Sequence, residues 1–169
     1  MRIGKGVTAI GPGVFHKCGS LNEIWISESV EAIGPAVFYE CSSLTEITIP
    51  ESVGTIGQHA FDGCSGLRKI KIGSGVTGID SYAFKNCTEL TSITVPYALA
   101  SILDGLPFEN CDRLLQFRVS PLNTAFKSES GMLYTRDGDV LIAVPAGIKR
   151  VALPEETKII GDNAFCKSH

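Results

Sequence analysis

The 169-residue sequence lacks several features that mark common classes of protein. It has no run of 18 apolar residues, which excludes a membrane-spanning helix of ordinary length. Its 15 basic residues are outnumbered by 18 acidic ones, so the basic excess needed for phosphate binding is missing and nucleic acid is not expected as a partner. The first seven residues contain no apolar signal-peptide core, so no secretory signal is predicted in them.

Motifs that would support catalysis or metal binding are also missing. No Ser/His/Asp order, H-E-x-x-H, phosphate-binding loop or EF-hand spacing is found. His16, His59 and His169 fall at unrelated positions, and the cysteines form no C-x-x-C pair. Carboxylates such as Glu23 and Glu46 are predicted on a shallow sheet, which offers no pocket for paired-acid chemistry. We therefore expect a protein that is not an enzyme and that holds no cofactor and no metal.

The sequence does contain a regular repeat. Cys18, Cys41, Cys64 and Cys87 follow one another at a constant interval of twenty-three positions, and Cys111 comes one position later than that interval predicts. The same interval separates columns of Val, Ile, Phe and Leu, so that one unit reads V-x-x-I-G-x-x-x-F-x-x-C-x-x-L-x-x-I-x-I-x. A fixed period of about 20–50 residues is typical of solenoids, in which each unit buries its apolar face only against its neighbours.

Local patterns within the unit predict its elements. The L-x-x-I-x-I end alternates like a strand with one buried face. Six such segments are predicted to stack as strands: 21–26, 44–49, 67–72, 90–95, 114–119 and 148–153. The half of the unit around Phe is too short for a stable α-helix, so one turn of 3₁₀ or α structure is expected there.

The residue after the first Ile of each unit is usually glycine. Gly11, Gly34, Gly57 and Gly161 occupy this position, and Asp80 replaces glycine in the fourth unit. Because glycine and aspartate tolerate a positive φ, we predict a left-handed backbone at this column.

The Phe and Cys columns define the expected core. Phe side chains at this spacing should stack as a continuous spine. The repeat cysteines are expected to be free buried thiols, because parallel stacking sets their Cβ bonds side by side instead of toward each other. Cys166 lies one residue outside the column and is predicted to be the most reactive thiol. Asn86-Cys87-Thr88 forms a glycosylation sequon, but its cysteine belongs to the core column, so we interpret it as a chance match.

The repeat is interrupted after Val119. Two apolar runs flank Asp137-Gly138, which is a strong signal for a β-hairpin. The repeat columns resume at Ile148. The predicted organisation is a single repeat domain over 1–169, with repeats over 1–124, a hairpin-containing insertion over 125–147, and repeats again over 148–169.

Both ends of the sequence fall inside a repeat unit. Counting back one repeat interval from Ile24 and Ile26 gives Met1 and Ile3, which places the start within a strand of a preceding unit. The Cys column reaches Ser168 next to the other end. Neither end carries the polar cap that is typical of solenoid termini, so we expect the sequence to be a segment of a longer protein.

The unit L-x-x-I-x-I-P-x-x-V-x-x-I-G-x-x-A-F-x-x-C resembles the leucine-rich repeat of the BspA-like family, the Treponema pallidum type, which has the same repeat length. Residues 47–61, ITIPESVGTIGQHAF, match that unit closely. The resemblance implies a right-handed leucine-rich repeat solenoid of the α/β type that is rich in β structure. A parallel sheet would line its concave side, with short helical or 3₁₀ turns on the other side. The resemblance also implies a surface protein that binds proteins of a host or of other cells.

A protein partner is expected on the outward positions of the concave sheet, where adjacent strands present independently variable side chains. On the family resemblance, the chain is predicted to be a non-catalytic protein-binding module of a bacterial adhesin-like protein, at the cell surface or secreted. The candidate binding residues are the outward pairs of successive strands: Glu23, Trp25, Glu46, Thr48, Lys69, Lys71, Thr94, Gln116, Arg118 and Arg150.

Trp25 is the single tryptophan of the chain, and it falls at one of these outward positions. Two interpretations of it stay open: an anchor of an interface, or a residue packed against a repeat unit outside this sequence or against a neighbouring column. Two alternatives to the binding module also stay open, a structural spacer and an intracellular scaffold. The outward columns differ from unit to unit, which favours a binding module over a uniform spacer.

Overall fold

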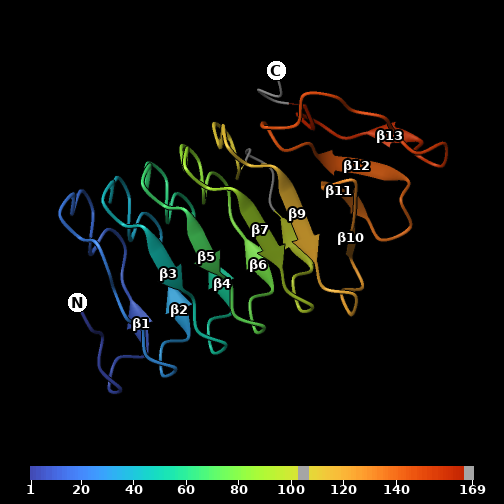
Figure 1. Cartoon of the computed structure of the whole chain (residues 1–169). Helices are drawn as coiled ribbons and strands as arrows, with labels where there is room; N and C mark the ends of the chain where they lie inside the picture. The colour runs from blue at the N-terminus through green and yellow to red at the C-terminus, as the bar shows by residue number, and fades with distance from the viewer. Residues whose placement is uncertain (103–106, 166–169) are drawn as a thin grey trace.

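The computed structural model describes residues 1–102 and 107–165, which form a stack of parallel coils followed by a small mixed sheet (Figure 1). Each coil lies beside the next, so equivalent residues of successive units form columns along the stack. The register confirms the period, because Ile10 pairs with Ile33 and Ile33 pairs with Ile56. The protein is therefore a parallel β-solenoid.

Two parallel ladders run along the stack. The first is a five-stranded sheet made of β1 (Ala9–Ile10), β2 (Ala32–Ile33), β4 (Thr55–Ile56), β6 (Gly78–Ile79) and β8 (Ser101–Ile102). The second follows the L-x-x-I-x-I segments as two pairs, β3 (Glu46–Thr48) with β5 (Lys69–Lys71) and β7 (Ser92–Val95) with β9 (Gln116–Val119). The first ladder was not predicted, because a strand of two residues is too short to show an alternating pattern.

The strands predicted at 44–49, 67–72, 90–95 and 114–119 are confirmed as β3, β5, β7 and β9. The segment 21–26 forms only an isolated parallel bridge, between Arg2 and Trp25. The prediction of a strand at 148–153 is wrong. The inserted segment occupies part of the edge of β9 that faces away from β7, since the Phe117 amide donates to the Gly131 carbonyl at 2.8 Å. Because that edge is taken, residues 148–153 have no strand to pair with there.

The predicted hairpin across Asp137-Gly138 is confirmed. Its strands are β11 (Met132–Thr135) and β12 (Val140–Ala143), which pair in an antiparallel manner, and β10 (Phe126–Glu129) adds a third strand on the other side of β11. The last strand, β13 (Ile159–Ile160), joins β12 in parallel, with Leu141 opposite Ile160. In the regular repeats, a short strand pairs with the equivalent strand of the preceding coil. For β13, strand β12 of the hairpin takes the place of that strand.

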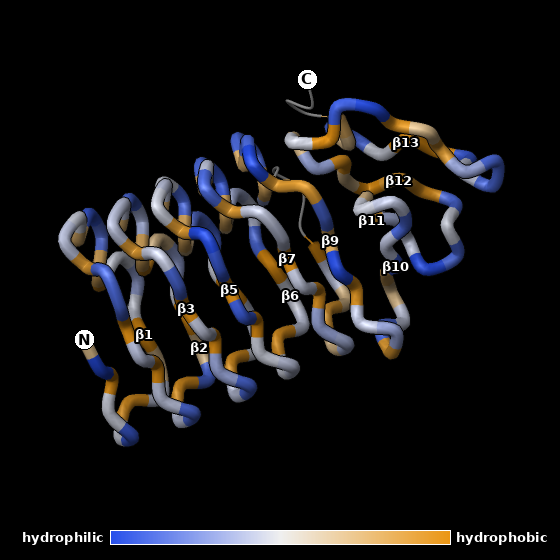
Figure 2. Tube along the Cα trace, viewed as in Figure 1, coloured by the Kyte–Doolittle hydropathy of each residue, from blue (hydrophilic) through white to orange (hydrophobic). Residues whose placement is uncertain are grey.

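The repeat columns form the core, and apolar residues recur at the same place in each coil (Figure 2). The rings of Phe15, Phe38, Phe61, Phe84 and Phe108 stack in sequence, with centroids 5.3, 5.2, 5.4 and 5.8 Å apart. The predicted spine is confirmed over these five coils. A separate small cluster lies under the hairpin: Met132, Tyr134, Leu141, Val144 and Ala164.

The column of free thiols is confirmed for Cys41, Cys64, Cys87 and Cys111, which are fully buried. Each thiol donates to the carbonyl of the Phe in the preceding coil, at 3.0–3.2 Å between sulfur and oxygen. Burial raises the pKa of Cys41 to about 11 and that of Cys111 to about 12, and it also raises the pKa values of Cys64 and Cys87. These side chains act as protonated hydrogen-bond donors between coils.

We expect the four buried thiols to resist alkylation by iodoacetamide at pH 8 in the native protein, because burial blocks access and the raised pKa suppresses the reactive thiolate. Cys18 is only half-buried and should be labelled first among the described cysteines. Mass spectrometry of labelled peptides over time measures this, with labelling in denaturant as the control. Labelling of Cys87 as fast as Cys18 would contradict the packed column. Cys166 lies outside the described residues, and its higher reactivity stays a prediction.

The prediction of a left-handed backbone after the column Ile is wrong, because none of those residues has a positive φ. The left-handed residues of the repeats form two other columns. One lies two positions later, with φ between 51° and 63°: Gly13, Ala36, His59, Tyr82 and Asn163. The other directly precedes the column cysteines, with φ between 54° and 77°: Lys17, Glu40, Gly63, Asn86 and Asn110. Glycine after Ile instead allows close stacking of the coils. A Cβ on Gly57 would lie 2.8 Å from the carbonyl carbon of Gly34.

The half of the unit around Phe consists of hydrogen-bonded turns. No helix is present among the residues that the structure describes, so the short helical turns expected from the sequence are unconfirmed. In the same residues there is also no helix long and apolar enough to cross a membrane.

Candidate functional site

The candidate site is the outward side of β3, β5, β7 and β9 together with residues 23–25, which we call the β3–β9 face (Figure 1). Strand alternation buries the central residue of each segment, such as Ile47 and Ile70, and turns its two neighbours outward. Thr48 is the Cα partner of Lys71, and Thr94 is the partner of Arg118. One outward column therefore follows the coils: Trp25, Thr48, Lys71, Thr94 and Arg118.

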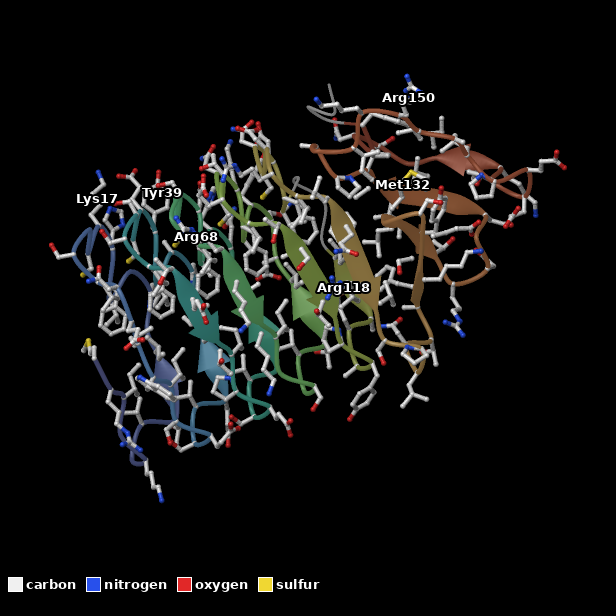
Figure 3. All side chains as sticks on the ribbon, viewed as in Figure 1. Lys17, Tyr39, Arg68, Arg118, Met132 and Arg150 are labelled. Carbon is white, nitrogen blue, oxygen red and sulfur yellow. The ribbon has the colours of Figure 1, made fainter. Side chains whose placement is uncertain are left out.

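Most of the predicted site residues lie exposed on this face, in the column just described and in the parallel one that contains Glu23, Glu46 and Lys69. Gln116 belongs to the second column and is half-buried. Arg150 is exposed but lies elsewhere, because 148–153 forms no strand next to β9. Figure 3 shows Arg118 over the strands of the face and Arg150 beyond the hairpin.

Trp25 has its backbone paired and its side chain free. Its amide donates to the Met1 carbonyl at 3.0 Å, and its carbonyl accepts from the Ile3 amide at 2.8 Å. Its side chain is nevertheless 67% exposed. The coils that the structure describes therefore do not cover the indole, so packing against a neighbouring column of these coils does not account for Trp25.

The cations of this side of the molecule differ in whether they meet a carboxylate. Lys69 Nζ lies 3.8 Å from Glu46, and Arg68 and Arg113 both reach Glu89, at 3.9 and 2.8 Å. By contrast, Lys71 and Arg118 have no carboxylate within ion-pair distance among the described residues. From Trp25 onward, this column therefore carries two positive charges without an ion-pair partner among the described residues.

A path of rings at the turns is a feature that the sequence analysis missed. His16 stacks on Tyr39 and His59 stacks on Tyr82, with centroids 4.9 and 5.0 Å apart, and Tyr39 meets His59 edge to face at 6.3 Å. Figure 3 places Tyr39 and the neighbouring Lys17 at the turns, away from the strands of the β3–β9 face. The path was missed because His16 and Tyr39 share one position of the unit whereas His59 and Tyr82 share another, so no single column contains all four rings.

Asp62 is the buried carboxylate beside this path, and it is 4% exposed. Its oxygens contact His59 Nδ1 at 2.9 Å and accept from Asn86 Nδ2 at 2.8 Å. Lys85 pairs with Glu109 at 2.8 Å, and this hydrogen bond raises the pKa of Lys85. These polar side chains thus bind one another, and two of the three contacts join neighbouring coils. We therefore interpret the path of rings as structural.

The described residues contain no cluster that suggests catalysis. No group of three or more His, Cys, Asp or Glu side chains within 1–102 and 107–165 is placed to hold a metal ion. A hollow of about 330 Å³ lies at the N-terminal side of the first coil, where Ile3, Val7, Val14 and Phe15 are among its lining residues. Its lining is mainly apolar and offers no set of converging polar groups.

Comparison with known families identifies the repeat. Six copies of the BspA type leucine rich repeat region match residues 8–130. The chain belongs to the BspA type leucine-rich repeat family. The resemblance inferred from residues 47–61 is thereby confirmed, and leucine-rich repeats of this kind generally form a non-enzymatic binding or scaffold fold. No curated protein matches the chain.

Solved structures of leucine-rich repeat proteins are similar to the chain. The pneumococcal vaccine antigen PcpA is 26% identical, with a TM-score of 0.85 over 97% of this chain and 41% of its own. A leucine rich cell surface protein from Faecalibacterium prausnitzii is 23% identical, with a TM-score of 0.77 over 97% of this chain and 51% of its own. A leucine-rich repeat protein from Bacteroides ovatus is 34% identical, with a TM-score of 0.62 over 68% of this chain and 29% of its own. The BspA type chain thus spans only about half, or less, of these proteins.

Proposed function

We propose that the chain is a non-catalytic protein-binding module of a bacterial cell-surface protein, with the β3–β9 face as its contact surface. The observation that carries the proposal is the column in which exposed Trp25 is followed by unpaired Lys71 and Arg118. An exposed indole on a regular sheet offers the large contact area typical of interface anchors. Cations without a carboxylate partner attract and orient a partner of complementary charge.

The surface location is supported by the proteins that share the fold. One of them is described as a cell surface protein and another as a vaccine antigen. We extend this setting to the present chain as a module that acts at the cell surface or after secretion. Its partner would then be a protein of a host or of another cell.

The test is capture of proteins from host matrix and mucosal preparations on the immobilised chain. The double variant Trp25→Ala/Arg118→Ala should lose capture by about tenfold or more, because both anchors of the column are removed. The double variant Tyr97→Ala/Arg136→Ala is the matched control, since it removes an exposed ring and an exposed cation elsewhere.

Thermal melts of both double variants should match the unmodified chain closely, because all four side chains lie at the surface. Capture that survives Trp25→Ala/Arg118→Ala at full affinity would remove this face from consideration. A chain that captures nothing from any preparation would favour the structural spacer instead.

A further inference from the structure

From Trp25 onward, the outward column carries its large side chains at every second coil, and Arg2 precedes Trp25 in the adjacent coil. Trp25, Lys71 and Arg118 alternate with the small residues Thr48 and Thr94. Neighbouring strands lie about 4.7–4.9 Å apart, so the large side chains recur at intervals of roughly 9–10 Å along the stack. Because the two threonines are small, the surface between the large side chains has room for a chain that lies flat on the face.

The charges of this face favour an acidic group of the partner at two of the three large side chains, Lys71 and Arg118. Lys71 and Arg118 have no carboxylate partner among the described residues, whereas Lys69, Arg68 and Arg113 are paired. Trp25 lies between charges of opposite sign, because exposed Arg2 is its bridge partner in the preceding coil and exposed Glu23 lies two residues away in the second outward column. The large indole itself therefore decides what binds there, and it suits an apolar side chain.

We propose that this column binds an extended acidic segment of a protein, which lies along the axis of the solenoid and crosses its strands. An apolar side chain would pack on Trp25, and two carboxylates would pair with Lys71 and Arg118. The inference rests on the proposed function of the face and names the chemistry of the partner.

The spacing specifies the segment further. A chain in the polyproline II conformation rises about 3.1 Å per residue and turns the same side toward a surface every third residue, which gives a repeat of about 9.3 Å. This repeat matches the interval of two coils. The segment is therefore an apolar residue followed by acidic residues three and six positions along, read in one of the two chain directions.

Synthetic peptides test the spacing directly, and Trp25 reports binding because it is the single tryptophan of the chain. The probes are capped peptides LPPEPPE and EPPEPPL, one for each direction, and the control LEEPPPP has the same composition with adjacent acids. One of the two probes should change the fluorescence of Trp25 saturably and bind about tenfold or more tightly than the control. The binding should weaken as salt rises, because the ion pairs are exposed.

Variants then separate the unpaired cations from the paired ones. Lys71→Ala and Arg118→Ala should each weaken the bound probe about threefold to fivefold at low salt, as exposed ion pairs do. Lys69→Ala and Arg113→Ala remove paired cations of the same side and should change the affinity by less than about twofold. Equal losses in the two pairs of variants, or equal binding of probe and control, would overturn the inference.

Failure of this inference is distinguishable from failure of the proposed function. If neither probe binds but protein capture still depends on Trp25 and Arg118, the acidic segment is wrong and the binding face stands. If capture is also independent of these two residues, both conclusions fail.

Discussion

Replacing Phe61 by alanine is expected to lower the free energy of unfolding by about 3–5 kcal/mol. The ring is fully buried and lies between the rings of Phe38 and Phe84, with centroids 5.2 and 5.4 Å away. Truncation leaves a cavity that both neighbouring coils must line, and stacked backbones cannot collapse to fill it without losing their register. In a solenoid the neighbour contacts supply the stability of each coil, so the loss affects the whole stack.

Denaturant unfolding followed by circular dichroism measures this effect. Phe165→Ala is the matched control, because Phe165 belongs to the same column but is 39% exposed. That substitution should cost less than about 1.5 kcal/mol, since little apolar surface is lost from the core. An unfolding midpoint unchanged by Phe61→Ala would contradict the stacked-spine structure.

Replacing Asn123 by alanine is expected to lower the free energy of unfolding by about 3 kcal/mol or more. The side chain is 1% exposed, and its Nδ2 donates to the carbonyls of Pro96 and Leu99 at 2.7 and 2.8 Å. Its Oδ1 accepts from the amides of Ala125 and Phe126 at 2.8 and 2.7 Å. Alanine would remove the side-chain partner of the Leu99 carbonyl and of two amides where the last regular coil meets the inserted sheet, while the Pro96 carbonyl keeps only the Leu99 amide at 3.3 Å. Each unsatisfied buried group costs about 1–3 kcal/mol.

The same unfolding measurement tests this prediction. Asn22→Ala serves as the control, because that side chain is exposed, and its effect should be within about 0.5 kcal/mol. Asn123→Asp keeps an acceptor for the two amides but loses both donors, so it should also destabilise the protein. A loss of less than about 1 kcal/mol for Asn123→Ala would show that water replaces these hydrogen bonds and that the junction is open.

Much of the β3–β9 face could be predicted from the sequence. The constant repeat interval determines which residues share a column, and the alternation of L-x-x-I-x-I determines which of them point outward. The repeat interval therefore places Lys71 and Arg118 in one exposed column, and the structure pairs Lys71 with Thr48 and Arg118 with Thr94 of the same column. What could not be predicted is that these two cations lack a carboxylate partner, because ion pairing depends on side-chain positions across coils.

Other features depended on the path of the backbone within a unit. Whether Gly57 is needed for a positive φ or for close approach cannot be read from its identity, since both uses favour glycine. The placement of Arg150 depended on the hairpin, which takes the edge of β9 that the resumed repeat would otherwise occupy. The ring path through Tyr39 and His59 likewise arises from contacts between non-equivalent positions of neighbouring coils.

The sequence by itself determined the repeat, the buried columns of Phe and Cys, the hairpin and the outward residues of the face. It could do so because a periodic chain buries each unit against a copy of itself, so a pattern within one unit specifies contacts between units. The tertiary structure alone decided where the backbone is left-handed, which charges are neutralised and how the hairpin joins the stack. These features depend on distances between coils and on the competition for one sheet edge, which no pattern within a single unit contains.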